Sequence, residues 1–409
     1  MTISIPSLTD KVFEQYEQSV MGTYGRFPIA LERGRGARVW DLEGREYLDF
    51  VAGIATCALG HSHPALTKAV TEQMEKLVHV SNLYYIPNQG ALAQWITERS
   101  VADQVFFCNS GAEANEGAIK LARKYGHRVL GIKKPKILTA HKSFHGRTLA
   151  TVTATGQPKY QKDFKPLVQG FIYAHYNDFR SIECAVHSNP ETVAILIEPL
   201  QGEGGVTPGN PAFFQQLRDF CTEKKILLIL DEVQVGMGRT GRLWGYENLG
   251  IEPDIFTLAK ALGGGVPIGA LCARKEFALF EPGDHASTFG GNPLATAAGL
   301  AVCRTLDQEH LIENARVRGM QLHGHLEALH NQYPKHIEQV RGWGLIQGLV
   351  LKSISSLDVV KCALAKGLLL VPAGPNVVRF VPPLVVTAAE IDQAMGILSE
   401  CLAGLCMAR

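Results

Sequence analysis

The sequence has no long apolar run, no excess of charge of one sign and no closely spaced pair of cysteines. Of its 409 residues, 40 are lysine or arginine and 39 are aspartate or glutamate, so the formal net charge is +1. Such a chain has no overall field that would attract nucleic acid or an anionic membrane. No apolar run could cross a bilayer, and residues 1–11 lack the basic start and apolar core of a signal peptide. We therefore expect a soluble, cytoplasmic protein.

The nine cysteines are odd in number, scattered and free of any Cys-x-x-Cys spacing. Disulfide frameworks and thiolate metal sites use paired or closely spaced cysteines, so we expect reduced thiols that mostly fill the core. The only spacing typical of a metal site is His61-x-His63. Because no cysteine or carboxylate ligand is near these histidines, we interpret them as turn or pocket residues and expect no metal.

The composition, with 46% hydrophobic and 19% charged residues, is typical of a compact α/β enzyme. The length exceeds what one hydrophobic core supports, so we expect two domains. From about Val105 to Arg274, short β-branched runs alternate with amphipathic stretches, which predicts β-α units around a mainly parallel sheet. The predicted division is an N-terminal segment (1–50) that packs with the small domain, a large domain (51–293) and a small domain (294–409).

The expected strands of the large domain are short apolar runs at 105–107, 136–140, 192–197, 226–230, 254–258 and 268–273. Helices are expected over 111–125 and 211–223, the second with proline at its first turn. In the small domain we expect strands at 345–351 and 377–381 and a closing helix over 388–405.

Ligands of open parallel sheets bind at the carboxyl ends of strands. There, Ser110, Gly111 and Ala112 join a predicted strand to a predicted helix. Backbone N–H groups at a helix start bind phosphate well when no bulky side chain intervenes. A tight turn capped by Asn109 or Ser110 would explain the same residues. The Walker spacing is absent, so this is not a nucleotide-binding loop of that kind.

Asp231 ends the strongly apolar run 226–230. A carboxylate buried there is costly unless a cation meets it, and a protonated pyridine nitrogen would be such a cation. Gln234 could then donate a hydrogen bond to the phenolate of the same ring. An aspartate that caps the following turn explains the segment equally well.

Lys260 follows an apolar strand and precedes three glycines. Most lysines lie in solvent, but one between Ala259 and Ala261, just beyond a buried strand, has no reason to be at the surface. Desolvation lowers the pKa of a lysine and frees it for Schiff-base chemistry.

Two arginines are candidates for carboxylate binding. Arg379 lies in the apolar strand predicted at 377–381, and Arg147 follows Phe144 by three residues. A guanidinium in apolar sequence usually meets a carboxylate, which belongs either to the protein or to a substrate. The residues alone leave both alternatives open.

With these residues in place, the sequence resembles the class III aminotransferases of the aspartate-aminotransferase fold. Within the family, the sequence is most similar to the acetylornithine aminotransferase branch. The resemblance runs from about Tyr24 to the C-terminus. It is carried by the segments CNSGAEANEGAIKLARKYG, FHGRTLATVTATGQPKYQ, EPLQGEGGV, LILDEVQVGMGRTG, TLAKALGGGVPIGA and STFGGNP. It implies fold type I of the pyridoxal-phosphate-dependent transferases, an α/β fold in which a large, mainly parallel-sheet domain joins a smaller α+β domain.

The resemblance also implies pyridoxal 5'-phosphate as cofactor. Lys260 would bind it as a Schiff base and then act as the acid and base of the proton shift. Asp231 would pair with the pyridine nitrogen, Gln234 with the ring oxygen, and Phe144 would stack on the ring. The phosphate would be bound by Ser110, Gly111 and Ala112 and by Thr288 of the partner subunit, which implies a homodimer with shared active sites.

For the substrates, the resemblance implies that Arg147 holds the α-carboxylate of N-acetylornithine and the distal carboxylate of 2-oxoglutarate, with Ser287 nearby. Arg379 would take the α-carboxylate of glutamate or 2-oxoglutarate. Glu203 would screen that arginine when the ω-amino substrate is bound and move aside for the keto acid. Tyr24 aligns with a tyrosine that positions ornithine in related enzymes.

We therefore expect transfer of the δ-amino group of N-acetylornithine to 2-oxoglutarate in arginine biosynthesis. The nearest alternatives are an ornithine δ-aminotransferase and a 4-aminobutyrate aminotransferase. A noncatalytic regulatory protein on the same scaffold is an alternative of another class. The presence of both Lys260 and Asp231 argues against it.

Overall fold

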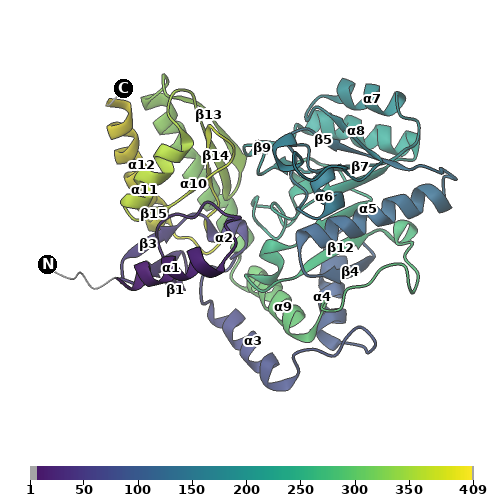
Figure 1. Cartoon of the computed structure of the whole chain (residues 1–409), viewed down its shortest axis with the longest axis horizontal. Coiled ribbons are helices and arrows are strands. Elements are labelled where there is room, and N and C mark those ends of the chain that lie inside the picture. The colour runs from purple at the N-terminus through teal and green to yellow at the C-terminus, as the bar shows by residue number, and fades with distance from the viewer. Residues whose placement is uncertain (1–6, 408–409) are drawn as a thin grey trace.

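The computed structural model describes residues 7–407 and contains a large central sheet of seven strands (Figure 1). The order is β4-β12-β11-β10-β7-β5-β6. Strands β11, β10, β7, β5 and β6 are mutually parallel, and β12 runs antiparallel to both of its neighbours. The strands are β4 (Gln104–Cys108), β5 (Lys136–Ala140), β6 (Phe171–Ala174), β7 (Thr192–Ile197), β10 (Leu227–Asp231), β11 (Ile255–Leu258) and β12 (Gly269–Ala273).

Helices cover both faces of this sheet, because successive residues of its central strands point to opposite sides and both sides are apolar. Leu227 packs in a cluster with Leu121 of α5 (Gly111–Arg128). Its neighbour Leu228 belongs to the cluster that contains Leu217 of α8 (Pro211–Lys224). Burial on both faces explains why β7 and β10 are nearly continuous runs of apolar residues instead of alternating apolar and polar ones. The other helices of this part of the fold are α6 (Leu149–Ala154), α7 (Phe179–His187), α4 (Pro87–Thr97), α9 (Pro293–Gln308) and α3 (Pro64–Lys76), which packs against α9.

The remaining part of the fold is built on two smaller sheets. One is antiparallel, with order β13-β14-β17-β16, and the other has the order β1-β2-β3-β15. In the second sheet, the N-terminal strand β3 pairs in parallel with β15, so residues 48–49 lie beside residues 368–369 (Figure 1). Their bounds are β1 (Leu31–Arg35), β2 (Arg38–Asp41), β3 (Glu46–Asp49), β13 (Ile337–Trp343), β14 (Ile346–Leu351), β15 (Leu368–Leu369), β16 (Val371–Pro372) and β17 (Val377–Phe380).

Helices α10 (Leu311–Gln332), α11 (Ser356–Ala365) and α12 (Ala388–Met407) accompany these sheets, and α1 (Leu8–Ser19) lies near β1 in Figure 1. Helix α9 packs against α3 and α4 as well as against α10. The division at residues 50 and 293 therefore stays a proposal. Shorter elements are α2 (Ala52–Ala55), β8 (Leu200–Gln201), β9 (Thr207–Pro208) and the 3-10 turns η1 (Pro158–Tyr160), η2 (Gly245–Asn248), η3 (Lys260–Gly263) and η4 (Lys275–Phe277).

The predicted elements agree with the observed ones to within a few residues at each end, but the N-terminal strands β1, β2 and β3 and the strands β6 and β13 were not predicted. All nine cysteines are free thiols and five of them are buried. Among residues 7–407, no helix combines the length and the apolar composition that crossing a membrane requires.

Candidate active site

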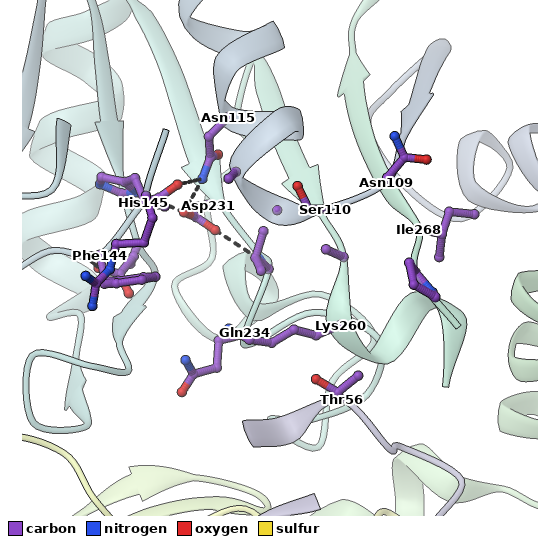
Figure 2. A pocket seen from close by; sticks show the side chains of 18 of the residues that line it. Thr56, Asn109, Ser110, Asn115, Phe144, His145, Asp231, Gln234, Lys260 and Ile268 are labelled. Atoms are coloured by element: carbon purple, nitrogen blue, oxygen red, sulfur yellow. Dashed lines mark hydrogen bonds and ion pairs between the residues drawn. The ribbon is translucent and has the colours of Figure 1, made fainter. Parts of the chain in front are cut away.

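A cavity of about 440 Å³ lies at the carboxyl ends of the central strands. Figure 2 shows its lining. Ser110 follows β4, Asp231 ends β10, and Lys260 comes two residues after β11. Thr56, from the segment after α2, forms part of another wall. The residues predicted from three separate strand ends therefore line one cavity.

Asp231 is buried at this cavity and is held by three donors. Its Oδ2 accepts a hydrogen bond from Nδ2 of Asn115 at 2.8 Å and lies 2.8 Å from Nδ1 of His145 (Figure 2). Its Oδ1 accepts from the backbone N–H of Val233 at 3.0 Å. The sequence offered two interpretations of Asp231, a cap of the following turn or a carboxylate that meets a bound cation. The structure shows the cap, and it also places the carboxylate at the cavity, where it could meet such a cation. Within the described residues, Nε2 of His145 is buried and has no hydrogen-bond partner.

Lys260 opens the turn η3 with a φ of 43°, a left-handed conformation that is uncommon for a lysine. Burial lowers the pKa of its ammonium group, while the carboxylates of Glu203 and Asp231 oppose the shift. The net result is a lysine with a pKa below its ordinary value, which raises the share of the nucleophilic free amine.

The start of α5 forms a small-residue turn on the cavity wall. Oγ of Ser110 accepts a hydrogen bond from the N–H of Glu113 at 3.2 Å, so Ser110 is the N-cap. The N–H groups of Gly111 and Ala112, in the first turn, have no acceptor inside the helix. A Cβ added to Gly111 would lie 2.7 Å from Cγ1 of Val233, so only glycine fits there. This turn is therefore both an N-cap and a candidate anion site.

Glu198 joins two loops at the cavity. Its Oε1 accepts from the N–H of Phe144 at 3.0 Å, and its Oε2 accepts from the N–H of Gly202 at 3.2 Å. Burial, and then the nearby charge of Asp231, raise the pKa of Glu198 well above its ordinary value. Phe144 lines the cavity, where its ring meets that of Tyr160 edge-on.

A partly buried ion pair lies beside Gln234, which itself lines the cavity. NH1 of Arg379 donates to Oε1 of Glu203 at 2.5 Å and to Oε1 of Gln234 at 2.9 Å. Arg379 is 1% exposed, and its Nε is buried without a partner among the described residues. Burial raises the pKa of Glu203, but Arg379, together with Lys260 and Gln234, lowers it, and the net pKa lies below the ordinary value. The sequence left open whether Arg379 meets a carboxylate of the protein or of a substrate. In this structure it meets a carboxylate of the protein, that of Glu203.

The other predicted binding residues lie further out. Arg147 lines the cavity with an exposed side chain, whose guanidinium lies 4.0 Å from the ring centre of Tyr160. Ser287 accepts a hydrogen bond from Nδ2 of Asn109 at 3.1 Å, which ties it to the turn before α5. Thr288 is exposed and Tyr24 is 74% exposed, and neither lines the cavity within this chain.

Sequence reasoning missed Asn115 and His145 as partners of Asp231. Asn115 lies four residues after Gly111, so the helical repeat places both on one face of α5. His145 directly follows Phe144, which was predicted. The two histidines with metal-like spacing have other contacts: Nε2 of His61 lies 2.7 Å from Oδ2 of Asp49, and His63 caps α3.

Comparison with known proteins identifies the family. The sequence model described as Aminotransferase class-III matches residues 20–402. An acetylornithine aminotransferase from Thermosynechococcus vestitus is 65% identical over 98% of this chain and 98% of its own length. One from Gloeobacter violaceus is 64% identical over 96% of this chain and 98% of its own.

Solved structures agree with this assignment. An ornithine aminotransferase from Toxoplasma gondii has a TM-score of 0.95 at 33% identity and covers 99% of this chain and 97% of its own. An N-acetylornithine aminotransferase from Stenotrophomonas maltophilia has a TM-score of 0.83 at 37% identity, with 97% and 100% covered. The predicted fold, fold type I of the pyridoxal-phosphate-dependent transferases, is therefore confirmed. The chain belongs to the class-III aminotransferases, which are pyridoxal-phosphate-dependent transaminases.

Proposed function

We propose that this chain transfers the δ-amino group of N-acetyl-L-ornithine to 2-oxoglutarate, giving N-acetyl-L-glutamate 5-semialdehyde and L-glutamate, in arginine biosynthesis. The observation that carries the proposal is the ion pair between the buried Arg379 and the partly buried Glu203, next to the cavity of Lys260 and Asp231. The names of the relatives that are 64–65% identical over almost the whole chain support N-acetylornithine as the donor.

The cavity fits pyridoxal phosphate in three respects. Asp231 is a buried carboxylate for the pyridine nitrogen, and Asn115 and His145 fix its orientation. The start of α5, at Gly111, offers N–H groups and no side chain to the phosphate. Lys260 has a lowered pKa, which suits covalent attachment of the cofactor aldehyde.

When bound, the cofactor supplies an electron sink that stabilises negative charge on the substrate carbon that loses its proton. Lys260 would then take that proton on Nζ and return it, since burial lowers the pKa of this amine and raises the share of its neutral form. Gln234 would donate a hydrogen bond to the ring oxygen, and Phe144 would cover the ring face. Ser110, Gly111 and Ala112 would hold the phosphate.

The substrates differ in how many carboxylates they carry to the site. N-acetylornithine has one, which we assign to the exposed Arg147, with Ser287 beside it. Its reacting end carries no carboxylate, which suits a pocket where Glu203 cancels the charge of Arg379. 2-Oxoglutarate has a second carboxylate, which would displace Glu203 and bind Arg379 bidentately.

We also propose a homodimer with shared active sites, located in the cytoplasm. Four bulky side chains near Thr288 are exposed in the single chain, namely Leu83, Tyr84, Tyr85 and Phe289. Such a patch is typical of a protein–protein interface. Thr288 of the partner subunit would then reach the phosphate of the neighbouring cofactor, and a partner would also cover the exposed ring of Tyr24.

Ornithine is the second candidate donor, because the fold is very similar to that of an ornithine aminotransferase. The deciding experiment is steady-state kinetics with N-acetylornithine, ornithine, 4-aminobutyrate and succinyl-diaminopimelate, each with 2-oxoglutarate. We expect the highest kcat/KM for N-acetylornithine, and a higher value for any other donor overturns the proposal. Protein that stays colourless with added pyridoxal phosphate would instead indicate a noncatalytic role.

A further inference from the structure

Two arginines and a glycine form one row across the antiparallel sheet next to the active site. Arg341 of β13 is paired with Gly348 of β14, and Gly348 is paired with Arg379 of β17. Residues directly opposite one another in antiparallel strands point to the same face of the sheet. Arg341 and Arg379 therefore project from the same face, separated by a position without a side chain.

Both arginines bind the loop 202–206, which connects β8 to β9. Arg379 binds the carboxylate of Glu203. Nε and NH2 of Arg341 donate to the carbonyl oxygen of Gly205, at 2.9 and 2.6 Å. One arginine thus holds a side chain of the loop, and the other holds its backbone two residues later.

The end of the loop fills the space that the glycine leaves. Val206 is fully buried, and a Cβ on Gly348 would lie 2.8 Å from Cβ of Val206. Val206 has a φ of 53°, which a β-branched residue adopts only when its surroundings enforce it. At the other end, Glu198 accepts the N–H of Gly202. The backbone is therefore fixed on both sides of Glu203, whose side chain is 23% exposed.

We propose that Arg341 is a positioning residue for substrate selection: it fixes the backbone of loop 202–206, so that Glu203 neutralises Arg379 for the ω-amino donor and only the Glu203 side chain moves for the keto acid. This inference rests on the proposed function, because it assigns a use to the same ion pair. Without the anchor at Gly205, the carboxylate of Glu203 samples more positions and neutralises Arg379 less often. A carboxylate ligand then competes better for Arg379.

The test compares the two half-reactions in the holoenzyme by single-turnover spectroscopy. Arg341→Met removes the donors and keeps the apolar stem, while Arg341→Lys retains a charge and one donor group. For Arg341→Met we expect kcat/KM of the ω-amino donor to fall about tenfold, the size expected from losing hydrogen bonds made by a charged donor. The KM for 2-oxoglutarate should stay the same or fall, and Arg341→Lys should lie between wild type and Arg341→Met. A parallel loss in both half-reactions, or no change in either, overturns the proposal.

Two controls separate positioning from general damage. Arg316→Met removes an arginine from α10 that pairs with Glu313 at the surface, and it should change neither half-reaction. In a Glu203→Gln background, Arg341→Met should have little further effect on the donor, because its influence passes through Glu203. An undiminished effect in that background refutes the inference. If Arg341→Met does not fold, the same two comparisons are made with Arg341→Lys.

The outcome is independent of which donor the enzyme prefers. If N-acetylornithine is not the best donor of the wild-type enzyme, the proposed substrate is wrong, and the Arg341 variants are measured with the donor that is best. The opposite changes in the two half-reactions then still decide the role of Arg341.

Discussion

Gly111→Ala tests whether the start of α5 is shaped around the cofactor phosphate. The added Cβ would lie 2.7 and 2.9 Å from the two methyl carbons of Val233, where ordinary contacts begin near 3.4 Å. Either Val233 or the helix start must therefore move by several tenths of an ångström. Val233 is not free to move alone, because its N–H donates to Asp231. The substitution should displace the N–H groups that we propose bind the phosphate, the carboxylate of Asp231, or both.

The expected change in the free energy of unfolding follows from two opposing effects. Overpacking a buried site costs about 1–3 kcal/mol, while alanine is favoured over glycine in a helix by about 1 kcal/mol. The free energy of unfolding should therefore fall by no more than about 2 kcal/mol. Cofactor affinity should fall more clearly, by about tenfold, because a hydrogen bond to a charged group contributes about 1.5–3 kcal/mol and is weakened here.

The assay is titration of the apoenzyme with pyridoxal phosphate, together with thermal unfolding of each variant. Gly90→Ala is the matched control, because Gly90 also lies in a helix, α4, and a Cβ there meets nothing within 4 Å. The double variant Gly111→Ala/Val233→Ala removes the clashing methyl carbons and should bind the cofactor as Val233→Ala does. Unchanged affinity in Gly111→Ala, or no recovery in the double variant, would refute the reasoning.

Three further predictions concern the charged groups. Lys260→Ala should abolish turnover and leave the fold intact by circular dichroism, and single-turnover transamination near the wild-type rate would refute its role. Arg379→Ala should raise the KM for 2-oxoglutarate at least about tenfold, the loss expected for a charged hydrogen-bonded pair, and an unchanged KM would contradict the proposed binding of 2-oxoglutarate by Arg379. Because burial lowers the pKa of Lys260 while Glu203 raises it, capture of pyridoxal phosphate by the apoenzyme should be half-maximal below the ordinary pKa of lysine. Glu203→Gln should move that midpoint lower still, and a rise would contradict the assignment.

The strands that could be predicted from sequence are those whose burial is encoded locally. Strands β5 and β7 match the predicted ranges 136–140 and 192–197 in full, because short runs of mainly apolar residues between polar ones leave little choice of bounds. Strand β6 is a four-residue strand at the edge of the sheet, three of whose residues are only partly buried. Its pattern does not stand out from a loop. The antiparallel direction of β12 is set by chain connectivity and has no local signal at all.

The residues of the site, too, could be predicted only where the local sequence encodes their position. Asp231 and Lys260 were predicted because each directly follows a buried strand, and a charged residue there needs a reason. Asn115 and His145 lie 116 and 86 residues from Asp231, so no local pattern links them to it. The pair Arg379 and Glu203 spans 176 residues. From the residues alone, a substrate carboxylate explained Arg379 equally well.

The two kinds of group in the site come from different parts of the fold. Asp231, Lys260 and the helix start at Gly111 all belong to the large sheet and its helices. Arg379 comes from the small antiparallel sheet. Arg341 of the same sheet donates hydrogen bonds to the backbone of loop 202–206. Donor preference can therefore change through the second sheet without disturbing the residues assigned to the cofactor. This separation explains why a TM-score of 0.95 to an ornithine aminotransferase and 65% identity to an acetylornithine aminotransferase are compatible. The overall fold reports the shared chemistry, whereas the choice of amine, on the roles proposed above, would depend on the contacts around Arg379 and Arg147.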